Sequence, residues 1–181
     1  VCSSDLSCVG INDVGAAQCV IDRLLARGCQ RIALINHDLS YKYARSREDG
    51  YHSGLKAHQC EYAVVEYASD LSFSAGKAAM QALLRHTERP DAVFAVSDTL
   101  AAGAVLAIHE AGLKMPQDIA VVGFDGTELA EMVTPPLTTV YQPSKEIGRK
   151  AVGLLLNKID NPEAPAERIM MDWQYISRAS A

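Results

Sequence analysis

The sequence has no long hydrophobic run and little aromatic or basic character. No apolar stretch reaches the roughly 18 residues that a membrane-spanning helix needs, although 49% of the 181 residues are hydrophobic. Aromatic residues make up 6% of the chain, and the formal net charge is -5, from 17 Lys and Arg against 22 Asp and Glu. Because nucleic-acid binding needs clustered Lys and Arg that displace counterions, this chain is not expected to bind DNA by itself.

Signatures of catalysis, metal binding and phosphate binding are also missing. No Gly-rich phosphate loop follows a predicted strand, and neither GxSxG, HExxH nor CxxC occurs. The cysteines are odd in number and lack metal-ligand spacing with His, which is typical of reduced thiols in a cytoplasmic protein. They are Cys2, Cys8, Cys19, Cys29 and Cys60. We therefore expect a cytoplasmic protein that is not an enzyme and has no cofactor, no catalytic residue and no metal ligand.

Short β-branched runs alternate with amphipathic helical stretches, which indicates a parallel sheet covered by helices. The run 119–124 (IAVVGF) is almost wholly apolar, as expected for a strand with both faces covered. Gly28 and Gly112 favour helix ends at their positions. The predicted strands are 9–11, 31–35, 63–67, 91–96, 119–124 and 137–141, with closing strands in 168–176. The predicted helices are 14–27, 44–58, 74–85, 99–111, 127–132 and 144–158. The fold class is therefore α/β.

Ligands of open α/β sheets bind outside the carboxyl ends of the strands. The residues that follow the predicted strands are therefore the site candidates. They are Asn36 and His37, Ser97 and Asp98, Asp125, and Gln142.

Two of these candidates are aspartates with two open interpretations each. Asp125 could accept hydrogen bonds from vicinal hydroxyls of a ligand, or it could cap the short helix 127–132. Asp98 lies at a strand-to-helix turn, where capping is the ordinary role and ligand contact is a second one.

Arg47 is the main cationic candidate. It lies in the first turns of a predicted helix that follows a polar loop, and its planar fork of donors suits sugar hydroxyls or a carboxylate. The alternative is a solvated surface pair with Glu48 or Asp49.

Several segments are similar to the LacI/GalR family of transcriptional repressors. They are VSDTLAAGA at 96–104, MPQDIAVVGFD at 115–125, PPLTTVYQP at 135–143, RGCQRIALI at 27–35 and RSREDGYHSGL at 45–55, and ISRAS at 176–180 resembles the family's last strand. The resemblance covers nearly everything from Val9 onward.

The resemblance implies a periplasmic-binding-protein-like type I fold, with two doubly wound parallel subdomains joined by three crossing strands. On this basis 9–30 is expected to be part of the N-terminal subdomain, 31–141 the C-terminal subdomain, 142–166 the return segment of the N-terminal subdomain and 167–181 the closing strands. Residues 1–8 are expected to be an artefact of sequence assembly or a disordered start. The DNA-binding headpiece and about half of the N-terminal subdomain are expected to lie outside this chain.

The resemblance also implies ligand-binding roles for particular residues. Arg47 matches the arginine of the family's RxxG element, Asp125 the acid after the VVGF-type strand, and Asp98 the acid of an ND-type turn. Asn12 matches the Asn of a DN pair, and Gln142 lies near a crossover. Three positions depart from the family pattern: Ile11 replaces the aspartate of the DN pair, Ser97 replaces the usual Asn, and Leu71, with Phe73 nearby, stands where relatives often place an aromatic ring.

The implied function is the effector-sensing and dimerisation core of a DNA-binding repressor. The effector is a small sugar or nucleoside in the cleft between the subdomains, operator DNA is bound only through the headpiece, and the protein is a homodimer. Helix 99–111 could supply part of the dimer surface, or its apolar residues could be buried against its own sheet. The alternative function is a periplasmic sugar-binding protein of a transport system.

Overall fold

The computed structural model describes residues 6–181 and divides the chain into two compact units. The smaller unit contains the residues up to Asn12 together with Gln142–Gln174, and the larger contains Asp13–Tyr141 and Tyr175–Ala181. The chain therefore passes between the units three times, as the resemblance implied. Within the described residues, no helix is long and apolar enough to cross a bilayer.

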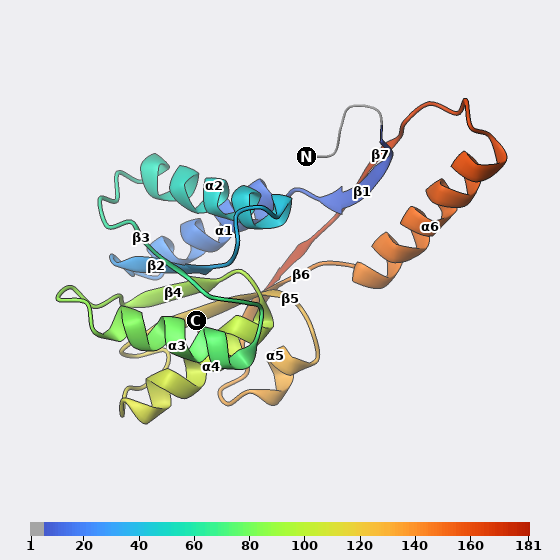
Figure 1. The fold of residues 1–181 in the computed structure, drawn as a ribbon. Coiled ribbons are helices and arrows are strands. Elements are labelled where there is room, and N and C mark those ends of the chain that lie inside the picture. Colours follow the sequence, from blue (N-terminus) through green and yellow to red (C-terminus); the bar gives the residue numbers. More distant parts are fainter. Residues whose placement is uncertain (1–5) are drawn as a thin grey trace. The chain divides into compact units, whose positions relative to one another are not determined.

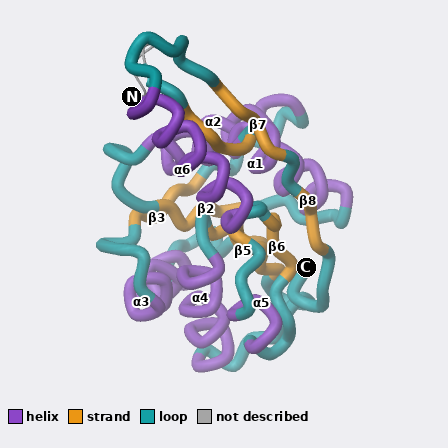
Figure 2. Tube along the Cα trace, turned by 90° about the vertical axis from the view of Figure 1, so that its right-hand side faces the viewer, coloured by secondary structure: helices purple, strands orange, loops and turns teal. Residues whose placement is uncertain are grey.

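The larger unit is built on a six-stranded sheet (Figures 1 and 2). The strands are β2 (Ile32–Asn36), β3 (Val64–Tyr67), β4 (Ala92–Ala95), β5 (Ala120–Asp125), β6 (Thr138–Tyr141) and β8 (Gln174–Ile176), in the order β3-β2-β4-β5-β6-β8. The pairs from β3 to β6 are all parallel. All residues of β2 and β4 are buried, because helices cover both faces of a parallel sheet.

The helices of the larger unit pack in two pairs, one on each face of the sheet (Figure 1). One pair is α1 (Asp13–Ala26) with α2 (Lys42–Ala57), and the other is α3 (Phe73–Leu84) with α4 (Asp98–Glu110). A short helix, α5 (Leu129–Met132), follows β5. Local chemistry fixes several of the helix ends: Ser97 caps α4 by accepting from the Leu100 amide, and Gly28 (φ 99°) follows α1.

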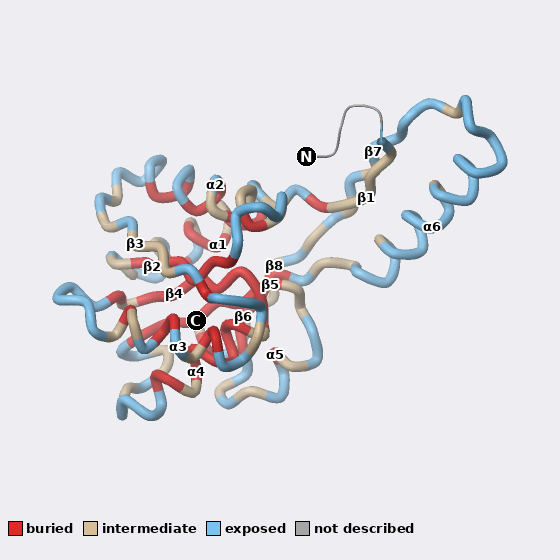
Figure 3. Tube along the Cα trace, viewed as in Figure 1, coloured by how far each residue is buried: buried red, intermediate tan, exposed pale blue. Residues whose placement is uncertain are grey.

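Glycine lets α3 and α4 approach each other closely. A Cβ added at Gly76 would lie 2.3 Å from the Leu100 carbonyl oxygen, and one added at Gly103 would lie 2.1 Å from the Phe73 carbonyl oxygen. The two helices therefore meet backbone against backbone. Most apolar residues of α4 are buried within the larger unit (Figure 3), so burial in its own unit accounts for its composition.

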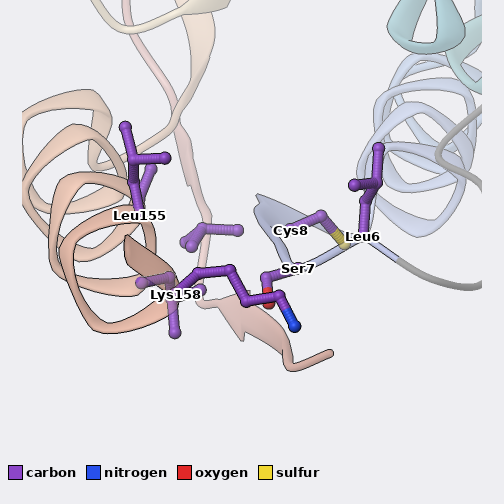
Figure 4. Close-up of a pocket in the computed structure, with 8 residues that line it drawn as sticks. Leu6, Ser7, Cys8, Leu155 and Lys158 are labelled. Carbon is purple, nitrogen blue, oxygen red and sulfur yellow. The ribbon is translucent and has the colours of Figure 1, made fainter. Parts of the chain in front are cut away.

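The smaller unit contains β1 (Cys8–Ile11), β7 (Arg168–Met171) and α6 (Ser144–Asp160). β1 and β7 pair in parallel, with Cys8 opposite Arg168. No residue of α6 is buried (Figure 3). Its apolar side chains Val152, Leu155, Leu156 and Ile159 are more than half exposed. A cavity of about 340 Å³ lies between α6 and the start of β1, where Leu155 and Lys158 lie opposite Leu6, Ser7 and Cys8 (Figure 4).

The expected elements are present, but two expected boundaries differ from the structure. The expected boundary between the N-terminal and C-terminal subdomains lay between residues 30 and 31, whereas the larger unit begins at Asp13. The reason is that α1 packs against α2, so residues 13–30 belong to the larger unit. Of the segment 1–8, residues 1–5 lie outside the described part. Cys8, by contrast, lies in a paired strand, and Ser7 Oγ accepts a hydrogen bond from the Glu167 amide.

Candidate functional site

The carboxyl ends of the parallel strands gather polar side chains at one edge of the larger sheet. β2 ends at Asn36, β4 is followed by Val96 and Ser97, and β5 ends at Asp125, which lies opposite Tyr141 of β6. Because the strands are parallel, these ends share one edge, which is where ligands of such sheets bind.

Arg47 is buried at this edge, with 4% of its surface exposed. Its Nε donates to Asp13 Oδ1 at 2.9 Å, and its Nη1 donates to the Val96 carbonyl oxygen at 2.6 Å. Nη1 also lies 3.6 Å from Asp125 Oδ1. The alternative of a solvated surface pair with Glu48 or Asp49 is therefore wrong.

The guanidinium of Arg47 also contacts aromatic rings. Its Cζ lies 3.5 Å from the centre of the Phe124 ring and 5.1 Å from that of Tyr43. A guanidinium held by two carboxylates, a carbonyl and an aromatic face has little freedom to move. Arg47 is therefore a preorganised hydrogen-bonding group.

Asp125 adopts an unusual backbone conformation at the end of β5. Its φ is 109°, in the region that favours glycine, and Gly126 follows with φ 69°. A Cβ at Gly126 would lie 2.7 Å from the Tyr141 Cα, so only glycine fits there. The alternative of capping the short helix is wrong, because α5 begins at Leu129 with Glu128 at its N-cap position. Strained residues of this kind occur at functional sites.

Asp98 holds the turn that follows Asp125. Its Oδ2 accepts from the Thr127 amide at 2.7 Å and from Thr127 Oγ1 at 2.9 Å, and its Oδ1 accepts from Thr139 Oγ1 at 2.6 Å. Burial raises the pKa of Asp98, while these hydrogen bonds act in the opposite direction. The capping role expected for Asp98 belongs to Ser97, because the Ser97 side chain accepts from the Leu100 amide.

Asn36 and His37 form the edge of the site beside α2. Asn36 is fully buried and donates to the Ala44 carbonyl oxygen and to Glu48, which fixes the start of α2. The His37 ring lies 5.4 Å from the Tyr41 ring, and its Nδ1 lies 3.4 Å from the Tyr43 hydroxyl. Both residues have internal packing roles.

The remaining predicted residues lie in different places. Leu71 and Phe73 are 42% and 43% exposed, in the loop after β3 and at the start of α3. Asn12 and Gln142 belong to the smaller unit, each next to a point where the chain passes between units. Of the predicted site residues, the larger unit therefore brings Arg47 and Asp125 into direct contact.

Asp13 is the site residue that sequence reasoning missed. It is the first residue of α1, where an acidic side chain is common because it faces the positive end of the helix dipole. Nothing in that pattern distinguishes a residue that binds an arginine. Ile11 stands where the family pattern has the aspartate of the DN pair, so no carboxylate lies at that position. The structure shows that Asp13, two residues later, accepts a hydrogen bond from Arg47.

This arrangement can bind hydroxyl groups. The carboxylate of Asp125, with 28% of the side chain exposed, can accept from vicinal hydroxyls, and a fixed guanidinium can donate to them. No group of three His, Cys, Asp or Glu side chains among residues 6–181 could hold a metal ion. Cys8, Cys19, Cys29 and Cys60 are free thiols, whereas Cys2 lies outside the described residues.

The fold and the site define an α/β protein with a cluster of polar side chains at the carboxyl edge of a parallel sheet. The sequence model of the periplasmic binding protein-like domain matches residues 21–181, so the chain belongs to that family. Within the family, it resembles the regulators of the LacI type.

Three known proteins illustrate this relationship. The ribose operon repressor of Escherichia coli K12 is 39% identical over 159 residues, which cover 87% of this chain and 48% of that protein. The transcriptional regulator CelR in complex with cellobiose has a TM-score of 0.94 and 33% identity, covering 100% of this chain and 56% of that one. A LacI family regulator from Enterococcus faecium with bound ribose has a TM-score of 0.89 and 28% identity, and the match covers 97% of this chain and 65% of that one. The chain thus spans about half the length of the curated relative.

Proposed function

We propose that this chain is the effector-sensing core of a LacI-type transcriptional repressor and that it binds a small sugar or nucleoside at Arg47 and Asp125. The observation that carries the proposal is the buried Arg47 guanidinium, fixed beside the exposed edge of Asp125 at the carboxyl end of the sheet. A hydrogen bond to a charged group contributes about 1.5 to 3 kcal/mol when its loss leaves no replacement. Two such groups are enough to orient a polyhydroxylated ligand.

The related proteins support a sugar as the effector. One similar structure contains ribose and another contains cellobiose, and a relative is the ribose operon repressor. Both sugars offer vicinal hydroxyls, which suit a carboxylate beside a guanidinium. Repressor relatives favour this function over a periplasmic sugar-binding protein.

In the whole protein, we propose that effector binding is coupled to the binding of operator DNA. A part of the protein outside this chain would contact that DNA. We also propose a homodimer and a cytoplasmic location, as expected for a regulator of transcription. Coupling requires that the effector binds the two conformational states with different affinities, because equal affinities shift no equilibrium.

The test is ligand binding to the full-length protein and to three single variants. Ribose, cellobiose and adenosine are screened by thermal shift, and any ligand that raises the melting temperature is then titrated calorimetrically. Arg47→Ala and Asp125→Ala should each weaken binding by about tenfold or more. Lys56→Ala removes an exposed cation at the far end of α2 and should bind as the parent does.

Two outcomes contradict the proposal. If no probe shifts the melting temperature of the parent, the sugar or nucleoside assignment fails. If Arg47→Ala binds a ligand as tightly as the parent, the ligand lies elsewhere.

A further inference from the structure

We propose that this site selects uncharged ligands and that Asp13 is the residue that imposes the selection. The inference rests on the proposed function, because it concerns which molecules the Arg47 site admits. It follows from one juxtaposition: a single buried guanidinium lies between the carboxylates of Asp13 and Asp125.

Around Arg47, the larger unit places two carboxylates beside one cation. The guanidinium of Arg47 lies 2.9 Å from Asp13 Oδ1 and 3.6 Å from Asp125 Oδ1. Among the ion pairs of the described residues, Arg47 is the most buried cation, with 5% of its side chain exposed, so water screens its interactions least. Asp98 is a third carboxylate, next to the turn that follows Asp125. It accepts hydrogen bonds from Thr127 and Thr139, which are neutral donors.

An anionic ligand is expected to bind weakly at this site. The guanidinium that could attract a phosphate or carboxylate is already neutralised, and an anion near Arg47 would also lie near Asp125. Like charges a few ångströms apart repel strongly when they are partly buried. Arg45, in the same helix, is engaged as well, because it donates to the Leu39 and Ser40 carbonyl oxygens.

A neutral polyol meets the same groups favourably. Its hydroxyl groups donate to the carboxylate oxygens and accept from the guanidinium, and no net charge has to be transferred from water. Excluding a charged analogue by repulsion is a common route to specificity. The site therefore discriminates a sugar from its phosphate ester without a dedicated contact to the phosphate.

Asp13 and Asp125 contribute in different ways. Asp125 lies at the edge of the sheet and is the more exposed carboxylate, at 28% against 19% for Asp13. Asp13 occupies the Nε of Arg47, which fixes the plane of the guanidinium and cancels its charge. Asp13 is thus a positioning and specificity residue, and its removal should change ligand preference more than it changes affinity for a neutral ligand.

The test uses matched pairs of ligands on the full-length protein. Ribose is compared with ribose 5-phosphate, glucose with glucose 6-phosphate, and adenosine with AMP, by calorimetric titration of the parent and of Asp13→Asn. Asp22→Asn is the control, because it removes a carboxylate from the same helix where Asp22 pairs with the exposed His58. Arg47→Ala reports whether the bound ligand occupies the proposed site.

We expect the parent to bind the neutral member of any recognised pair at least about tenfold more tightly than its phosphate. Asp13→Asn keeps an acceptor for the Nε and should reduce this ratio by about three- to tenfold, whereas Asp22→Asn should leave it unchanged. If Asp13→Asn does not fold, the ratio measured in the parent still decides whether the site excludes anions.

A phosphate ester that binds as tightly as its parent sugar, in a protein whose binding depends on Arg47, overturns the selection and leaves the proposed function intact. A ratio that is the same in Asp13→Asn and in the parent overturns the role of Asp13. Binding that is indifferent to Arg47→Ala overturns the proposed site, and the inference fails with it.

Discussion

Replacing Gly103 by alanine tests the close packing of α3 and α4. In an exposed helix, Gly→Ala stabilises a protein by about 1 kcal/mol, because glycine loses more backbone entropy on folding. At Gly103 the new Cβ would lie 2.1 Å from the Phe73 carbonyl oxygen and 2.6 Å from the Lys77 amide nitrogen. Both atoms belong to the backbone of a helix, so no side chain can rotate away to make room.

The size of the effect follows from the distance. Real Cβ contacts essentially never fall below 3.0 Å, so α3 and α4 must separate by about 0.9 Å at this point. Forcing extra volume into a packed interior costs about 1 to 3 kcal/mol, with backbone contacts at the upper end. After the gain in helix propensity, the net loss of stability is about 2 kcal/mol, which lowers the melting temperature by about 4 to 8 °C.

The assay is thermal unfolding of the full-length protein followed by circular dichroism. Gly148→Ala is the matched control, because it lies within α6 and a Cβ there meets nothing within 4 Å. It should raise stability by about 1 kcal/mol. If Gly103→Ala were as stable as the parent or more stable, the backbone-on-backbone packing would be refuted.

Three further predictions concern the site and the core. Because burial raises the pKa of Asp98, the folded state keeps its proton to higher pH than the unfolded state. The contribution of Asp98 to the free energy of unfolding therefore falls as pH rises from the ordinary pKa of the carboxyl group to its raised pKa. Urea unfolding at a series of acidic pH values should show this fall in the parent protein, and it should be missing in Asp98→Asn. Both Asp125→Gly and Asp125→Ala lose the ion pair with Arg47, but only glycine relieves the positive φ, so the Gly variant should be about 1 kcal/mol more stable in denaturant titrations. Tyr51→Phe should cost about 1 to 2 kcal/mol by urea unfolding, because the buried hydroxyl donates to the Ile32 carbonyl oxygen at 2.8 Å; equal stability would show that this hydrogen bond contributes nothing.

The order of strands and helices could be predicted from the sequence. The predicted strand 31–35 is β2 at Ile32–Asn36, and the predicted helix 99–111 is α4 at Asp98–Glu110. These elements follow from hydrophobic period and from Gly at helix ends, which are properties of neighbouring residues. Because ligands of parallel sheets bind at the carboxyl ends of the strands, the sequence also predicted a site at the edge of the sheet where Asp125 lies.

Other properties were decided only in three dimensions. Asp13 reaches Arg47 across 34 positions of the chain, and Asp98 reaches Thr139 across 41. The unit to which α1 belongs likewise depends on its packing against α2. The sequence by itself therefore determined which segments are strands and helices and which strand ends carry polar groups. Only the tertiary structure decided that Arg47 is buried between two carboxylates and that Asp98 holds a turn, because both depend on groups that are distant in the chain and adjacent only after folding.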